Sequence, residues 1–374
     1  MFRQRTGLRR RSRPRSIALD QTEWFVPAVL INRVLGVTGR ILTLLLTVGI
    51  TLIGLVALTF CIGRVVPIDP VLSVVGQKAS EEVYQRVFLE MGLDKPLWQQ
   101  FLVYAGKLVR GDFGISFVTN RPVLSDLAGF FPATLELATL GLLAGTLIGV
   151  PAGVAAAYWH DKWPDYVIRF VGLIGYSVPI FWLGLVGLFV FYSRLDWVSG
   201  PGQIDVFYQG IVKPVTGSLL IDSLLSGEWE VFGNALSHIV LPAALLGYYS
   251  LAYISRMTRS MMLDQLSREY VLTARLKGAT EYRAVMLHAL RNAAIPLVTV
   301  IALSYGGLLE GSVLVETVFA WPGIGNYIAS SLFRADINAV LGGTVLVGAV
   351  FILLNMVSDV VYQMLDPRSN LRRR

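Results

Sequence analysis

Few residues of this 374-residue chain have the types and the spacing that enzyme chemistry requires. Three histidines, His160, His238 and His288, are scattered without metal-ligand spacing, which argues against a dedicated metal site. The one cysteine, Cys61, has no partner for an internal disulfide and is typical of a buried or lipid-facing thiol. No G-x-x-x-x-G-K-S/T phosphate loop occurs, so we expect no directly bound cofactor, no metal and no catalytic residue.

One short run, Asp112-Phe113-Gly114, matches a magnesium-binding motif of protein kinases. Neither a Gly-rich phosphate loop nor a His-Arg-Asp catalytic loop accompanies it, so the kinase interpretation is dismissed. Chemistry in this chain is therefore expected to be binding and movement rather than bond making.

The most informative segment is a polar stretch that carries Lys and Arg between two long apolar stretches, Tyr270 to Pro296. Arg268 to Lys277 predict a short helix that Gly278 closes in the left-handed conformation, and Thr280 can cap a second helix. Both halves carry small and apolar residues, which favour a docking face for a partner over a catalytic face. These residues are Val271, Ala274, Ala279, Val285, Leu287 and Leu290.

The elements that must position this hairpin are membrane spans. A chain that is 54% hydrophobic and 15% charged, with a mean hydropathy of +0.61, is too apolar for an ordinary soluble domain. Runs of about 20 uncharged residues can cross the hydrocarbon core. Six such runs occur, at Ile41 to Gly63, Leu137 to Trp159, Phe170 to Ser193, Val231 to Ser255, Asn292 to Leu309 and Ile337 to Ser358. The first lacks a cleavage site, so we interpret it as a retained helix.

Lys and Arg near the span ends predict the orientation. Nine arginines precede the first span, seven basic residues lie in the loop after the fourth, and four follow the sixth. All of them fall on one face, so both termini and the hairpin are expected to be cytoplasmic. The run Arg9-Arg10-Arg11 is explained by topology and contact with anionic membrane lipid, without nucleic acid.

The expected fold is an all-α, multi-pass membrane protein with six transmembrane helices, a cytoplasmic hairpin and an outer helical insert. Apolar spacing predicts two amphipathic helices in the insert, one over Glu81 to Met91 and one around Trp98 to Leu108. Pro151, Pro179 and Pro242 lie inside spans and permit bends. The expected parts are a flexible basic leader (1–40), the first transmembrane helix (41–63), the insert (64–132), a five-helix core (133–362) with the hairpin at 264–292, and a tail (363–374).

The hairpin resembles the coupling loop of membrane permeases in ATP-binding-cassette importers, specifically the dipeptide, oligopeptide and nickel branch. The matching residues read Tyr270-Val-x-Thr-Ala-Arg-x-Lys-Gly278, then His288-Ala-Leu-Arg-Asn292 and Pro296. Leu272 and Thr273 depart from the broader importer consensus, so the branch match is the stronger one. Further matching stretches are Gly92-Leu-Asp-Lys-Pro-Leu, Gly111-Asp-Phe-Gly-Ile-Ser, Ser177-Val-Pro-Ile-Phe-Trp182, Val315-Glu-Thr-Val-Phe-x-Trp-Pro-Gly323 and Leu365-Asp-Pro-Arg368.

The resemblance implies a permease subunit in a bacterial cytoplasmic (inner) membrane that forms half of a path for peptides or related solutes. It implies four further subunits: a second, homologous permease, two cytoplasmic ATPase subunits that hold ATP and magnesium, and an extracytoplasmic solute-binding protein. By this resemblance the residues that couple to the ATPase are Tyr270, Thr273, Ala274, Arg275, Lys277, Gly278, His288, Arg291 and Asn292. Nickel chelates, opine-like conjugates and glutathione stay open as cargo.

Two carboxylates stand in the apolar stretches. Glu136 is expected in the first turn of the second span, where it meets the positive end of that helix's dipole. Glu310 lies about 21 Å beyond Pro296 along a helix, where a charge should face protein or water. Glu310 either receives the amino terminus of a peptide or is held by Ser304 or Ser312. We expect Glu310, Ser177 and Pro179 on the translocation path.

Two other classes of function stay open at this point. An ion-driven secondary transporter would need no ATPase, but it usually shows internal repeats and intramembrane relays of ionisable residues, and Glu310 stands nearly alone. A membrane scaffold without cargo would leave the prolines inside the spans unexplained.

Overall fold

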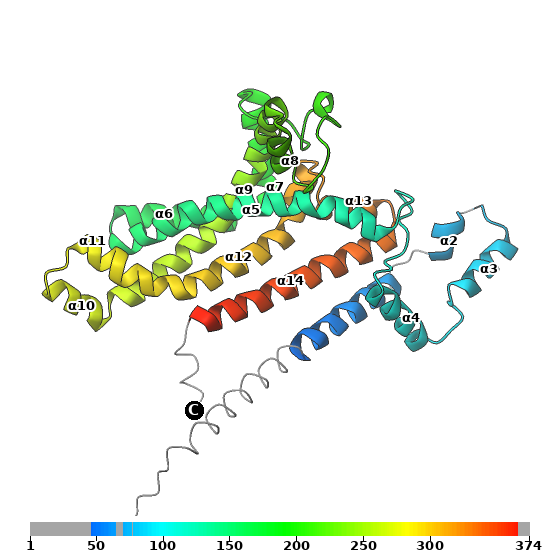
Figure 1. Cartoon of the computed structure of the whole chain (residues 1–374), viewed down its shortest axis with the longest axis horizontal. Coiled ribbons are helices and arrows are strands. Elements are labelled where there is room, and N and C mark those ends of the chain that lie inside the picture. Colours follow the sequence, from blue (N-terminus) through cyan, green and yellow to red (C-terminus); the bar gives the residue numbers. More distant parts are fainter. Residues whose placement is uncertain (1–45, 65–69, 77, 366–374) are drawn as a thin grey trace, which may run out of the picture. The chain divides into compact units, whose positions relative to one another are not determined.

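The computed structural model describes residues 46–64, 70–76 and 78–365 (Figure 1). The expected leader, the first residues of the expected first span (41–45) and the tail from 366, with most of the Leu365-to-Arg368 motif, lie outside the described residues. Contacts divide the chain into two units, 1–50 and 51–374, and the packing below is that of the second. All regular elements of the described chain are helices, which confirms the all-α prediction.

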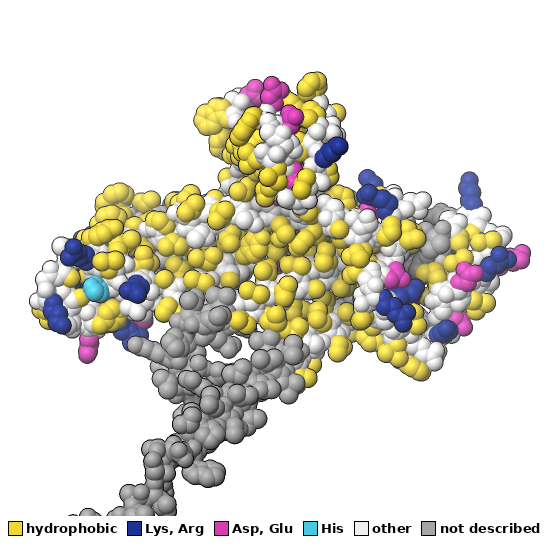
Figure 2. All heavy atoms as spheres, in the orientation of Figure 1, with side chains coloured by type: hydrophobic (Ala, Val, Ile, Leu, Met, Phe, Trp, Pro, Cys, Tyr) yellow, Lys and Arg dark blue, Asp and Glu magenta, His cyan; other side chains and the backbone are white. Residues whose placement is uncertain are grey.

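Five helices of the described chain are long and apolar enough to cross a membrane. They are Leu46–Arg64, α5 (Val123–Tyr158), α9 (Trp229–Leu266), the run Glu281–Val318, and Ile337–Ser358 of α14 (Ile337–Leu365). The run Glu281–Val318 joins α11 (Glu281–Arg283), the π-helix η3 (Ala284–Leu290) and α12 (Arg291–Val318). Figure 2 shows mostly hydrophobic side chains along the middle of the bundle, and charged side chains near α10 and α11 (269–283), near α2 to α4 (70–109) and around α8 (219–226).

The third expected span is bent rather than straight. α6 (Trp163–Ser177) meets α7 (Ile180–Gly187) and its continuation η1 (Leu188–Arg194) at 99°. The reason is local, because Pro179 lacks a backbone N–H and forces Val178 out of the helical conformation, to φ −94° and ψ 128°. The bend permitted by Pro179 is confirmed, and the described chain reaches six spans only if this pair counts as one.

The insert after the first span contains α2 (Pro70–Val75), α3 (Glu81–Glu90) and α4 (Leu97–Val109), so both predicted amphipathic helices are confirmed. α4 packs on the first helix, where the ring of Phe60 contacts Phe101 and Tyr104. α5 begins at Val123, earlier than the sequence indicates, and takes in the last residues of the expected insert.

The expectation for Glu136 is wrong, because this residue lies well inside α5 and not in its first turn. Its carboxylate instead accepts hydrogen bonds from the backbone N–H of Leu220 at 2.9 Å and from the Ser218 hydroxyl. These groups begin α8 (Leu219–Ser226). Glu136 therefore serves the N-terminus of another helix, a pairing between elements that local sequence does not reveal.

α5 and α9 pack with their backbones in close approach. A side chain at Gly145 of α5 would come within 2.6 Å of the Ser250 Oγ atom on α9, and one at Gly141 within 2.7 Å of Leu246. Gly149 and Gly153 continue the same stripe at intervals of four residues along α5. Small residues at this spacing permit close helix packing in a membrane, so α5 and α9 form the central pair of the bundle.

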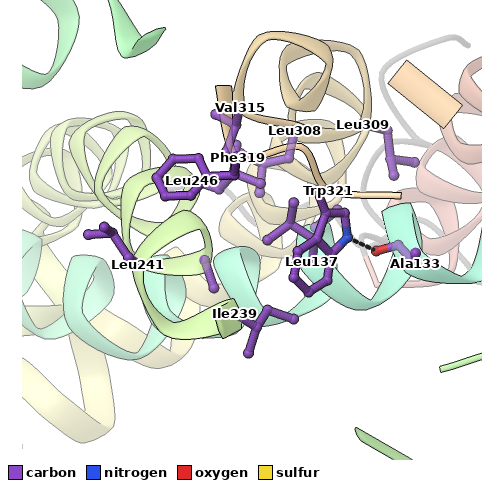
Figure 3. Close-up of a cluster of buried hydrophobic side chains, with 12 residues drawn as sticks. Ala133, Leu137, Ile239, Leu241, Leu246, Leu308, Leu309, Val315, Phe319 and Trp321 are labelled. Atoms are coloured by element: carbon purple, nitrogen blue, oxygen red, sulfur yellow. Dashed lines mark hydrogen bonds between the residues drawn. The ribbon is translucent and has the colours of Figure 1, made fainter. Parts of the chain in front are cut away.

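The largest buried cluster lies where α5, α9 and α12 meet (Figure 3). Trp321 is 1% exposed and its indole N–H donates to the backbone oxygen of Ala133 at 3.0 Å. Leu137 and Leu246 belong to the same cluster, and each is fully buried. The cluster connects the end of α12 and the turn before α13 (Ile324–Phe333) to the central helix pair.

Candidate functional site

The expected hairpin is present as two helical segments around a left-handed glycine. α10 (Glu269–Leu276) is capped by Lys277, and Gly278 follows with φ +87°. The Ala279 N–H donates to the Ala274 oxygen at 3.0 Å, and the Gly278 N–H donates to the Arg275 oxygen at 2.9 Å. This pair of hydrogen bonds is a Schellman motif, which uses the carbonyls left free at a helix end.

The second segment opens as the sequence indicates. The Thr280 hydroxyl accepts from the Arg283 N–H at 3.4 Å, and α11 begins at Glu281. An ion pair between Arg275 and Glu281 at 3.1 Å crosses the turn. Because both side chains are partly exposed, this pair contributes little free energy and mainly orients the tip.

Tyr270 connects the two halves near their base. Its hydroxyl lies 2.8 Å from the Gln265 Oε1 atom and 3.3 Å from the backbone oxygen of His288. The Asn292 side chain donates to the same oxygen at 2.8 Å. The structure thus brings Tyr270, His288 and Asn292 together, while Thr273, Lys277 and Arg291 lie exposed on the surface.

The prediction of a docking face is wrong for two of its six residues, Val271 and Val285, because they are buried inside the protein. Val271 is 0% exposed and Val285 is 5% exposed. Both pack with Met262 of α9 and with Val154 and Ala157 of α5. These contacts couple the hairpin mechanically to the central helix pair, since a displaced hairpin moves these packed side chains.

The apolar residues that the hairpin does expose are Leu272, Leu276, Tyr282 and Leu287. Leu276 is 80% exposed and Tyr282 is 73% exposed. Lys277 and Arg283 flank them. An apolar surface with a basic rim is the composition of a protein docking site. The spacing of Leu272 and Leu276, four residues apart on α10, is the signal that could have identified them.

The structure shows no hydrogen bond or ion pair between Glu310 and the other expected path residues, Ser177 and Pro179, within the described chain. Ser177 is the last residue of α6, and Pro179 precedes α7 at the bend. Glu310 is exposed on α12 and makes no hydrogen bond or ion pair within the described chain. Ser312 donates to Glu316, and Ser304 pairs with Ser250. The alternative that Ser304 or Ser312 holds Glu310 is therefore wrong.

Sequence reasoning missed a second carboxylate on α12. Glu316 is 0% exposed and accepts hydrogen bonds from the Thr134 hydroxyl at 2.8 Å and the Ser312 hydroxyl at 3.0 Å. The backbone N–H of Asn326 donates to its other oxygen at 3.1 Å. Glu316 is part of the Val315-to-Gly323 motif, but the motif does not reveal its hydrogen-bond partners, which are Thr134, Ser312 and Asn326.

The loop before α8 is organised around one more buried carboxylate, Asp222. Burial alone would raise the pKa of Asp222. Hydrogen bonds from the backbone and hydroxyl of Thr216 and from the backbone N–H groups of Val215 and Gly217 outweigh that effect, so its pKa is lowered. The charged form of Asp222 is therefore favoured by the fold.

Comparison with protein families identifies the family of this chain. Residues 149–370 match the model of the binding-protein-dependent transport system inner membrane component. The chain belongs to this family. Residues 37–138 also match the N-terminal model of the same membrane component. This confirms the predicted permease of an ATP-binding-cassette importer, a membrane component that is not itself an ATPase.

Similar proteins place the chain in the dipeptide and oligopeptide branch of the family. It is 44% identical to the probable D,D-dipeptide transport system permease protein DdpB of Escherichia coli, over 84% of this chain and 92% of the relative. It is 43% identical to the di/tripeptide transport system permease protein DppB of Pseudomonas aeruginosa, over 86% and 96%. A glutathione transport system permease protein, GsiC of Escherichia coli, is 35% identical over 83% and 92%.

Proposed function

We propose that this chain forms half of the path of an ATP-driven peptide importer and that the hairpin 264–292 receives force from a cytoplasmic ATPase. The observation that carries the proposal is the hairpin, with large apolar side chains exposed at its tip and a base packed into α5 and α9. The names of the similar permeases, which are mostly dipeptide transport systems, support peptides as cargo.

Coupling follows from the two ends of the hairpin. A partner ATPase contacts Leu272, Leu276 and Tyr282 at the tip, and the rigid Schellman turn at Gly278 transmits its displacement. The buried base passes the displacement to Met262 on α9. Rigid-body rocking of the packed helices then changes which side of the membrane the path faces. ATP and magnesium are held by the ATPase subunits.

Glu310 supports a path along one face of α12. An isolated carboxylate in a membrane helix is costly in lipid, so it faces water or another protein chain. The residues exposed beside it, Leu303, Gly311, Leu314 and Thr317, continue the same face. In the assembled importer this face lines the path, and Glu310 attracts the amino terminus of a peptide. Ser177 and Pro179 serve the path through the bend between α6 and α7.

The working complex pairs this chain with a second, similar permease, two ATPase subunits and an extracytoplasmic binding protein. It sits in a bacterial cytoplasmic membrane, with both termini and the hairpin on the cytoplasmic side, because the basic residues near the spans gather there. Membrane lipid surrounds the spans in this proposal, against the hydrophobic side chains that Figure 2 shows on the surface.

Purification from the native membrane in mild detergent tests the proposal. We expect a second permease and two ATPases to co-purify, and the reconstituted complex to take up a labelled dipeptide only with ATP and its binding protein. Uptake of a nickel chelate or an opine without uptake of any peptide would contradict peptides as cargo but would leave the role as an ATP-driven importer standing. A chain recovered without an ATPase, and with uptake driven by an ion gradient, would overturn the coupling role.

A further inference from the structure

A cavity of about 460 Å³ lies between the end of η1, the loop after it and α9, and the proposed transport cycle does not use it. Its lining combines two carboxylates, an imidazole, two hydroxyls and a phenol ring, from Asp196, Asp205, His238, Ser199, Ser237 and Tyr192. None of its lining residues is a lysine or an arginine. The cavity therefore favours a cation.

The Nε2 atom of the buried His238 imidazole faces this cavity. Its side chain is 2% exposed, and Nδ1 lies 2.9 Å from the backbone oxygen of Asn234. A carbonyl oxygen can only accept, so Nδ1 carries the hydrogen, and in the neutral ring the lone pair is on Nε2. That nitrogen faces the Oδ1 atom of Asp205 at 3.5 Å.

The separation of 3.5 Å can be compared with two explanations, a direct ion pair and a bridging metal ion. A charge-assisted N–H···O hydrogen bond would bring the two atoms to about 2.7–2.9 Å. Zinc binds imidazole nitrogen at about 2.0–2.1 Å and carboxylate oxygen at about 2.0–2.2 Å, so a tetrahedral angle places the two ligand atoms roughly 3.4 Å apart. The observed spacing fits a bridging metal ion better than a direct ion pair.

Asn234 orients both ligands. Its backbone oxygen fixes the His238 ring, and its side-chain N–H donates to the Oδ2 atom of Asp205 at 2.6 Å. The Asn234 Oδ1 atom also accepts from the Asp205 backbone N–H at 2.9 Å. Metal-binding histidines and carboxylates are commonly held through their other atoms in this way.

We propose that this cavity binds a divalent transition-metal ion of the zinc class, with the His238 Nε2 atom and the Asp205 Oδ1 atom as its two protein ligands. Water, or a donor atom of a bound solute, fills the other coordination positions. Binding at this cavity is independent of which cargo the importer carries.

A rival cluster exists in the described chain, where His160, Asp161 and Asp165 place three ligand atoms within 4.8 Å of one another. There both oxygens of Asp165 already pair with Arg259, at 2.6 and 2.7 Å. A metal would have to break this bidentate pair, so the rival cluster is the weaker ligand set. His160 nevertheless supplies a matched control, because it is a second histidine beside an aspartate.

The test uses the full chain in lipid nanodiscs, purified without a histidine tag and stripped with a chelator. Co²⁺ titration followed by visible absorption, with Zn²⁺ as competitor, should show one ion per chain. Asn234→Ala should weaken binding by about 10–100-fold, and Asp205→Asn and His238→Gln by at least as much. His160→Ala should bind like the unchanged chain.

Asp205 is more than half exposed, so we expect Asp205→Asn to fold, and thermal unfolding of the variant separates loss of metal from loss of structure. Failure of the unchanged chain to bind Co²⁺ or Zn²⁺ stoichiometrically would overturn the proposal. Affinities of Asp205→Asn and His238→Gln equal to that of the unchanged chain would also overturn it. Loss of binding in His160→Ala alone would overturn it as well and would place the ion at the rival cluster.

Discussion

The carboxylate of Glu316, near the end of α12, accepts a hydrogen bond from the backbone N–H of Asn326 on α13. The chain reverses between these two residues, and Thr134 of α5 completes the arrangement by donating to Glu316 and accepting from the Ile324 N–H at 2.8 Å. One buried acid therefore connects α5, α12 and the first turn of α13. A backbone turn of this kind needs such partners, because its N–H groups are buried away from water.

Glu316→Ala should destabilise the folded chain by about 2–4 kcal/mol, because it leaves the Thr134 hydroxyl and the Asn326 N–H without an acceptor. The Ser312 hydroxyl keeps the Leu309 oxygen as its acceptor. Glu316→Gln keeps one acceptor oxygen and should cost less. Denaturant unfolding of the detergent-solubilised protein, followed by tryptophan fluorescence, measures both. Equal stability of the two variants would show that the acceptor is dispensable.

Gly278→Val should lower ATP-dependent uptake by roughly tenfold or more, since a left-handed conformation costs about 1–2 kcal/mol for a residue with a Cβ atom. No atom lies within 4 Å of the position that a Cβ would take at Gly278, so steric contact with neighbours plays no part. Gly278→Asn is the matched control, because Asn tolerates this conformation. Transport assays in vesicles, with membrane insertion checked by immunoblot, compare the two. Normal uptake by the Val variant would contradict the lever mechanism.

Leu276→Glu should remove the ATPase from the purified complex without unfolding the chain, because Leu276 is 80% exposed. Val206→Glu makes the same change at an 82% exposed residue in the loop between α7 and α8, and should leave the ATPase bound. Quantitative co-purification reports the difference. Retention of the ATPase by Leu276→Glu would place the docking surface elsewhere.

The hairpin could be predicted from sequence because its signals are local. Gly278 and Thr280 each act on the backbone within a few residues, and the structure has both the left-handed turn and the cap. The burial of Val271 and Val285 could not be predicted, since small apolar residues at helical spacing suit a docking face and a protein core equally. Their partner Met262 lies on another helix, and only packing separates the two interpretations.

Two acids show the same limit. Glu136 stood out as a charge in apolar surroundings and Glu316 lay unnoticed inside a motif, yet their partners Leu220 and Thr134 lie on α8 and α5, far along the chain. Pro179 shows the opposite case, because proline acts on its own backbone and that of the preceding residue, so a bend was predictable. Its size of 99° was not, since tertiary packing sets the angle.

Asp222 should make stability depend on pH in the acid range. Its folded pKa lies below the unfolded value of about 3.9, so its contribution is fully present above that value and is lost as pH falls through the folded pKa. Asp222→Asn should cost about 1.5–3 kcal/mol at neutral pH, and the difference from the unchanged chain should shrink below about pH 4. Thermal unfolding of both proteins between about pH 3 and 7 measures how the stability difference changes with pH. A difference that grows on acidification would contradict the assignment.

Glu310→Gln should change peptide uptake while the complex assembles normally, because the exposed carboxylate makes no contact within the described chain whose loss would affect folding. If Glu310 attracts the amino terminus of a peptide, the variant should lose uptake of free dipeptides by more than that of the same dipeptides with acetylated amino termini. Removing the positive charge from the cargo thus serves as the control for removing the negative charge from the path. An equal loss for both cargoes would mean that Glu310 faces a basic residue of the second permease, and no loss for either would exclude it from the path.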